Sequence, residues 1–256
     1  MILQKKTNKE LRFMLEAAIW GAVASLSLFI GSIIGLCLEV PAKINAYLMA
    51  LGTGVLIGAS AFDLLVESME TSGILLTSAS FLGGALLFTL IEIFLYIKGG
   101  TNRKRSTGNI AANSGIAIFI GTLMDAIPES LIIGLSLIET NHVDILFIVA
   151  IFISNFPEAL SSTVGLKKDG YKKLRILFLW LSVVVISALS SLIGYSFLAN
   201  ASDIVIASIE AFGAGGLIAM VCSTMLPEAY QKAGPVVGFI SCIGLMIALG
   251  LSSMSG

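Results

Sequence analysis

Charged residues are what this sequence lacks most. Of its 256 residues, 12% are charged and 57% are hydrophobic, whereas a soluble domain carries about 25% charged residues. A shortage of this size excludes an ordinary soluble domain and predicts an integral membrane protein, with the lipid bilayer as its surroundings. The net charge of −1 gives no indication of a nucleic-acid partner, and we expect none.

Histidine and cysteine are also scarce. The one histidine, His142, stands in a short polar connection, and the three cysteines lie in apolar segments at no metal-ligand spacing. We interpret Cys37, Cys222 and Cys242 as small buried residues, because free cysteine is usually buried. The sequence contains no glycine-rich phosphate loop and no His-Glu-x-x-His or Gly-x-Ser-x-Gly motif. We therefore expect neither an enzyme nor a tightly bound cofactor.

Long apolar runs dominate what is present. A membrane-spanning helix needs about 20 apolar residues, and the chain holds eight runs of this kind. They predict an all-α integral membrane protein that forms a single transmembrane domain, with a short N-terminal tail over 1–15. The predicted spans are 17–38, 46–67, 77–98, 113–138, 143–166, 174–198, 204–227 and 233–252.

The basic residues predict an orientation. Eleven of the 15 lysines and arginines fall in the connections after the first, third, fifth and seventh spans, and the other four precede the first span. Because positive loops stay in the cytoplasm, we expect a plasma (inner) membrane protein with both termini outside. The four N-terminal charges argue weakly for the opposite orientation. The longest connection, 99–112, reads as a flexible cytoplasmic loop.

Two matching polar inserts interrupt the fourth and fifth apolar runs, at 125–130 and 154–159. Asp125 and Glu129 are four residues apart and share one helix face, and Asn155 and Glu158 are three apart and share a face of the next helix. A short connection joins the two runs, so these faces should lie at similar depth near mid-membrane. Intramembrane carboxylates are rare and usually functional.

Each insert also contains a proline. A proline removes a backbone donor and frees a carbonyl one turn earlier, here those of Met124 and Ile153, and free carbonyls are tolerated only against protein or a water-lined cavity. The inserts thus predict a cluster of oxygen ligands. Because no lysine or arginine lies at this depth, the carboxylates must bind a cation or be protonated. Protonated structural carboxyls remain the alternative interpretation.

A weak repeat links the second and seventh runs. Gly52, Gly54, Leu56 and Glu67 recur at one constant spacing as Gly213, Gly215, Leu217 and Glu228. The two runs have opposite predicted directions, which is typical of inverted-repeat transporters. We therefore predict a three-two-three arrangement of the eight helices, in which the fourth and fifth are central.

At these residues the chain resembles the ZIP (Zrt-/Irt-like) family of divalent metal transporters, in its bacterial branch. That family has eight helices and a His-Asn-x-Pro-Glu-Gly motif followed by a second Pro-Glu-Gly motif, which together form its metal site. Here Asp125 stands in place of the histidine and Ala126 in place of the asparagine, and Ser130 and Ala159 replace the glycines. The positions that carry over as metal ligands are Asp125, Glu129, Ser154, Asn155 and Glu158.

The resemblance implies transport of a divalent transition metal, and homodimers are possible in the family. An oxygen-only ligand set suits harder cations such as Mn²⁺ or Fe²⁺, although Zn²⁺ also accepts carboxylates. A non-transporting metal sensor or structural relative and a proton-coupled carrier of an organic cation remain alternatives. Outside the motifs, Asp63, Glu67, Glu92 and Glu228 are either cation ligands along the path or structural polar ends, with Glu228 placed to pair with Lys232.

Overall fold

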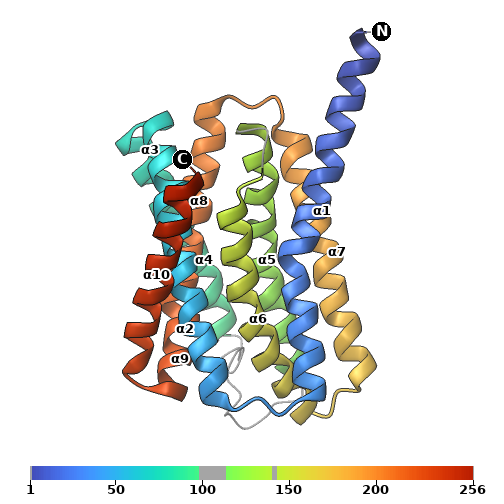
Figure 1. The fold of residues 1–256 in the computed structure, drawn as a ribbon, viewed down its shortest axis with the longest axis vertical. Coiled ribbons are helices and arrows are strands. Elements are labelled where there is room, and N and C mark those ends of the chain that lie inside the picture. The colour runs from blue at the N-terminus through green and yellow to red at the C-terminus, as the bar shows by residue number, and fades with distance from the viewer. Residues whose placement is uncertain (1, 98–113, 140–142, 256) are drawn as a thin grey trace.

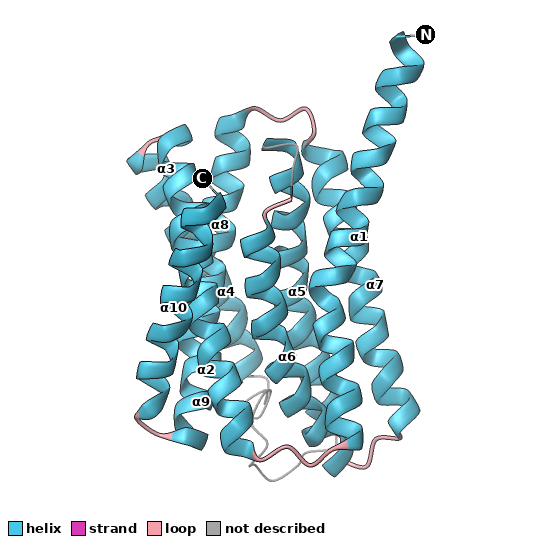
Figure 2. Ribbon diagram, in the orientation of Figure 1, coloured by secondary structure: helices cyan, strands magenta, loops and turns pink. Residues whose placement is uncertain are grey.

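The structure is a computed structural model that describes residues 2–97, 114–139 and 143–255. Eight of its helical segments are long and apolar enough to cross a membrane, so the protein is a multi-pass, all-α membrane protein (Figures 1 and 2). The predicted loop 99–112 and His142 lie outside the described residues. The segments are α1 (Ile2–Cys37), α2 (Ala42–Ala59) with α3 (Val66–Ser72), α4 (Ile74–Ile97), α5 (Ser114–Glu139), α6 (Ile145–Lys168), α7 (Lys173–Leu198), α8 (Asp203–Met220) with α9 (Leu226–Ala233), and α10 (Val236–Ser255).

The spans fall where the apolar runs predict them, with one clear difference at the N-terminus. The predicted tail over 1–15 is helical from Ile2 and continues into the first span. Figure 1 shows this part of α1 projecting beyond the bundle, at the same face at which α10 ends. Figure 1 shows the α1–α2 connection, the α6–α7 connection and the end of α9 at the opposite face. These segments contain the described basic residues Lys43, Lys172 and Lys232.

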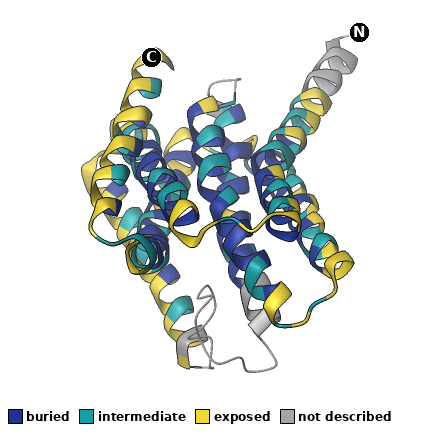
Figure 3. Cartoon of the chain, turned by 60° about the horizontal axis from the view of Figure 1, so that its bottom comes forward, coloured by how far each residue is buried: buried dark blue, intermediate teal, exposed yellow. Residues whose placement is uncertain are grey.

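The helices pack as two groups. In one, α1 packs against α6 and α7, and α7 also packs against α5; in the other, α2 packs against α10 and α4 against α8. The groups meet chiefly where α2 contacts α6, and to a smaller extent where α8 contacts α5. In the most apolar stretch of α6, 72% of the residues are buried, whereas in the most apolar stretch of α4 only 11% are buried. Figure 3 shows the same contrast, with α5 and α6 buried in the centre.

The inverted repeat predicted from α2 and α8 is confirmed by how these helices pack. A Cβ at Gly54 would collide with the Ser241 carbonyl oxygen on α10, and a Cβ at the matching Gly215 would collide with the Phe81 carbonyl oxygen on α4. Small residues allow such close backbone approach between membrane helices. Because α2 and α10 rise in Figure 1 while α8 and α4 descend, the two pairs are inverted copies of one unit.

A π-helical segment interrupts both copies at the same place. It covers Ser60–Leu65 after α2 and Val221–Met225 after α8, and the spacing that relates the glycines also relates Ser60 to Val221. Such segments are rare and occur frequently at functional sites. Each is tethered to its neighbouring helix, because Ser252 Oγ donates to Asp63 Oδ1 at 2.9 Å and Ser223 Oγ donates to Glu92 Oε2 at 2.6 Å. In the first copy the π-helical segment carries the carboxylate and the neighbouring helix the hydroxyl; in the second copy the segment carries the hydroxyl and the neighbouring helix the carboxylate.

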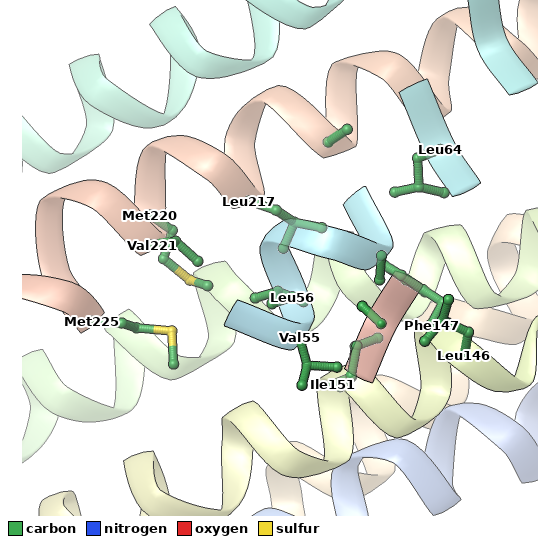
Figure 4. Close-up of a cluster of buried hydrophobic side chains, with 14 of the residues drawn as sticks. Val55, Leu56, Leu64, Leu146, Phe147, Ile151, Leu217, Met220, Val221 and Met225 are labelled. Carbon is green, nitrogen blue, oxygen red and sulfur yellow. The ribbon is translucent and has the colours of Figure 1, made fainter. Parts of the chain in front are cut away.

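The main apolar core lies where the two groups meet (Figure 4). Leu56 of α2 and Ile151 of α6 are fully or almost fully buried there, and they pack in the same cluster as Leu217 and Met220 of α8. The cysteines are not part of any core. Cys37, Cys222 and Cys242 are exposed, so our interpretation of them as buried residues is wrong. In a membrane protein, an apolar segment does not imply burial, because its outer face contacts lipid.

Candidate functional site

The two polar inserts lie inside continuous helices. Pro128 is within α5 and Pro157 within α6, so neither proline ends its helix. The five predicted ligands are buried, each at most 4% exposed. Asp125 and Glu129 come from α5, and Ser154, Asn155 and Glu158 come from α6. Burial of polar groups in helices that also face lipid requires internal partners.

Two side-chain contacts join α5 and α6 at the level of the inserts. Asn155 donates through Nδ2 to Glu129 Oε2 at 3.3 Å, and Thr122 donates through Oγ1 to Glu158 Oε1 at 3.4 Å. Because α5 and α6 are antiparallel, these two contacts place the inserts at the same level. Both distances are at the long end for a hydrogen bond. A cation that takes over these carboxylate oxygens would therefore displace two long hydrogen bonds.

The freed carbonyl of Ile153 faces protein, as expected. A Cβ at Gly52 of α2 would lie 3.0 Å from Ile153 O and 2.7 Å from Ser154 Cα, so α2 approaches the α6 insert without any intervening side chain. Ser154 Oγ donates to Ile151 O of its own helix at 3.0 Å. Its lone pairs remain available as ligands, but its proton is used within α6.

The carboxylates do not all converge. Within the described part of the chain, no three His, Cys, Asp or Glu side chains are close enough together to hold a metal ion. Asp125 instead lines a cavity that α5 shares with α4 and α8. A cation site on these two helices must therefore combine carboxylate oxygens with amide, hydroxyl or carbonyl oxygens. Whether Asp125 belongs to it stays a prediction.

Three further buried polar residues were not predicted. Asn45 at the start of α2 is 3% exposed, and its Nδ2 donates to Pro157 O at 3.0 Å. Among the described residues its Oδ1 has no hydrogen-bond partner. The predicted span, which begins at residue 46, missed Asn45 by one residue.

The other two residues are Thr122 and Glu210. Thr122 shares the helix face of Asp125 and Glu129, and Glu210 is a 3% exposed carboxylate in α8. Each is a polar residue within an apolar run, and that is the signal that could have identified it.

Acidic groups gather at the end of the bundle that carries the termini. Asp144 caps α6, where Phe147 N donates to Asp144 Oδ1 at 3.1 Å. Asp63 and Asp144 lie close enough to repel electrostatically. Burial raises the pKa of the Asp144 carboxyl, and the backbone donors of Phe147 and Leu146 partly oppose this rise. Two carboxyl groups from different segments, those of Asp63 and Asp144, therefore lie near each other at this end of the bundle.

A charged network lies at the opposite end of α6. Lys232 Nζ is 2.5 Å from Glu228 Oε1 and 2.9 Å from Ser161 Oγ, and Ser161 Oγ donates to Glu228 Oε1 at 2.8 Å. The expected pairing of Glu228 with Lys232 is thus confirmed. Glu228 is 6% exposed, so this carboxylate is held by α6 and α9 together. Glu92, at the same end, is held by Ser223 as described above.

No protein-family model matches the chain, and no curated protein is significantly similar to it. The geometry of the two inserts and the polar groups around them must therefore carry the functional argument.

Proposed function

We propose that the protein transports divalent transition-metal cations, zinc or manganese and iron, across the plasma membrane as a member of the ZIP family. The observation that carries this proposal is the contact between the two inserts, Glu129 with Asn155, beside which Thr122 of α5 donates to Glu158. All four side chains are buried where the two helix groups meet. No lysine or arginine lies in the middle of any spanning segment of the sequence. A bound cation is the simplest counter-charge for such carboxylates.

The surroundings of the inserts supply the remaining ligands. Asn45, Asn155 and Ser154 offer neutral oxygens beside Glu129 and Glu158, and all are at most 4% exposed. An oxygen set of this kind favours Mn²⁺ and Fe²⁺ and still accepts Zn²⁺. The sequence provides no histidine or methionine in these inserts that would favour zinc.

The inverted repeat also supports a transporter. In inverted-repeat transporters the substrate site lies near the bilayer midplane, at the interface of the repeats. The α5 and α6 inserts are central in this way, between α2 of one copy and α8 of the other. We further propose that the basic face with Lys43, Lys172 and Lys232 is cytoplasmic and that both termini are outside.

The experiment is metal uptake by the full-length protein in sealed liposomes, with Zn²⁺, Mn²⁺, Fe²⁺, Co²⁺, Cd²⁺ and Mg²⁺ offered separately. Glu158→Gln keeps the size of the side chain and removes its charge, so we expect uptake to fall by at least about tenfold, the low end for disturbing a metal site. Glu70→Gln is the matched control, because Glu70 is exposed on α3 and should leave uptake unchanged.

The outcome also separates the alternatives. Metal binding without uptake would replace transport by a sensing role. Uptake of an organic cation, but of no metal, in a Glu158-dependent manner would favour the proton-coupled carrier. Equal uptake by the wild type and Glu158→Gln would remove the α5 and α6 inserts from the transport site.

A further inference from the structure

A cavity of about 230 Å³ lies between α4, α5 and α8. Apart from Asp125, the residues that line it are apolar side chains and glycines. Leu87, Ile127 and Phe212 stand at its edge and are 47%, 36% and 39% exposed. Because these residues belong to the middle of spanning helices, the cavity opens toward the lipid and away from either aqueous face.

The two repeats differ at a position that lines this cavity. The residue after Gly54 on α2 is Val55, which is fully buried, whereas the residue after the matching Gly215 on α8 is Gly216. A Cβ at Gly216 would find its nearest neighbour, Gly84 O, at 3.9 Å. The space that valine fills in one copy is therefore open in the other.

The packing of the central helices differs in the same way. On the α2 side, Gly52 is pressed against Ser154 of α6. On the α8 side, Gly213 matches Gly52. Asp125 matches Ser154, because each stands three residues before the proline of its insert. Both Gly213 and Asp125 line the cavity. A Cβ at Gly213 would meet the Ile132 side chain of α5, whereas a Cβ at Gly52 would meet the Ser154 backbone of the α6 insert. Thus α2 contacts the backbone of the α6 insert directly, and α8 meets α5 through a side chain that follows the α5 insert.

Size and polarity indicate the kind of occupant. A dry apolar cavity of about 150 Å³ already accepts benzene, whereas pockets for drug-sized ligands occupy about 300–1,000 Å³. Water needs two to four polar partners in such a space, and the lining does not provide them. A hydrocarbon chain fits, because it gains dispersion contacts with the apolar walls.

Depth in the membrane indicates the source of that chain. The bilayer hydrocarbon core is about 30 Å thick, so the acyl chains of each leaflet end near its middle, at the level of Met124–Pro128 on α5. We propose that this cavity binds the end of one acyl chain of a bilayer phospholipid. Since Asp125 lines the cavity, the chain would also restrict access to the α5 insert; that consequence rests on the proposed function, whereas the binding does not.

The test uses the full-length protein in vesicles of phosphatidylcholine that carries a diazirine at the end of one acyl chain. After illumination, cross-linked peptides are mapped by mass spectrometry. We expect strong labelling of Met124–Pro128 and of the α4 and α8 residues at the mouth. Gly216→Val, which reproduces the Val55 of the other repeat, should reduce this labelling to the level found on the exposed face of α7.

Two further variants keep the result decisive. Leu87→Trp places a larger side chain at the mouth of the cavity, on the side that faces the lipid, and it should also remove the labelling. Gly238→Val on α10 is the matched control, because a Cβ there meets nothing within 4 Å, and it should label as the wild type does. Unchanged labelling in both Gly216→Val and Leu87→Trp would overturn the proposal, since the chain would then contact only the general lipid-facing surface.

Metal uptake by the same variants separates the two claims. Loss of labelling with altered uptake supports both the chain site and its effect on the α5 insert. Loss of labelling with normal uptake supports the chain site alone. If the wild type takes up no metal and the variants still lose the labelling, the lipid site stands and the result counts against the proposed transport function.

Discussion

Asn155 on α6 donates its side-chain amide to Glu129 on α5, with Nδ2 3.3 Å from Oε2. Both residues are at most 4% exposed and come from antiparallel helices that carry matching proline-containing inserts. The contact makes the two inserts one polar unit at the junction of the two helix groups. The orientation of the Glu129 carboxylate is thus set partly by the neighbouring helix.

This contact predicts that Asn155 and Glu129 act together on the cation. Asn155→Ala should weaken metal affinity by about 10–100-fold, the range found when a group that orients a ligand is removed. Combined with Glu129→Gln, its effect should be less than additive, with a coupling of about 0.5–3 kcal/mol. Calorimetric titration of Mn²⁺ or Zn²⁺ into the purified variants measures this; simple additivity would show that the two residues act independently.

A second prediction concerns the network of Ser161, Glu228 and Lys232 near the C-terminal end of α6. Lys232→Ala leaves the buried carboxylate of Glu228 without its ammonium partner, which should lower the free energy of unfolding by about 3–5 kcal/mol. Lys232→Leu combined with Glu228→Leu removes both charges and should restore most of that loss. Thermal unfolding in detergent measures both variants. A double variant as unstable as Lys232→Ala would show that apolar packing, and not the unpaired charge, decides stability there.

The third prediction concerns Asp144 at the start of α6. Asp144→Ala removes the acceptor for Phe147 N and should destabilise the protein by about 1 kcal/mol, whereas Asp144→Asn keeps an acceptor and should be nearly neutral. Since burial raises the pKa of Asp144 above its ordinary value of 3.8, the folded protein holds this proton more tightly than the unfolded chain does.

The sign of the pH effect follows from that rise. The contribution of Asp144 to stability is fully present below the unfolded pKa and is lost as pH rises through the folded pKa. The melting temperature of Asp144→Asn should therefore rise relative to that of the wild type as pH increases from about 4. Parallel pH profiles of the two proteins would contradict this prediction.

Much of the fold could be predicted because the bilayer imposes it. A run of about 20 apolar residues has few alternatives to a spanning helix, and the eight runs appear as eight helices. The constant spacing between Gly54 and Gly215 also predicted the inverted repeat, since close helix packing requires a small residue at each copy. The same hydrophobic signal failed for Cys37, which is exposed, because lipid-facing and buried residues are equally apolar.

The site could be predicted only in part. The spacing within each insert identified Glu129, Asn155 and Glu158, which the structure brings together across α5 and α6 with Thr122. It did not identify Asn45, whose contact with Pro157 joins segments far apart in the chain. It also could not show that Asp125 lines a cavity shared with α4 and α8, because the surroundings of a side chain depend on which helices pack around it.

The sequence by itself determined the membrane environment, the eight helices, the pairing of two proline-glutamate inserts and the repeat that relates the two halves. These follow from hydrophobicity and from spacing along one helix, which are local properties. Tertiary structure alone decided which polar groups meet and where space remains. Gly216 shows the reason: a missing side chain makes a cavity only when the neighbouring helices do not close over it, and the packing of three separate segments settles that.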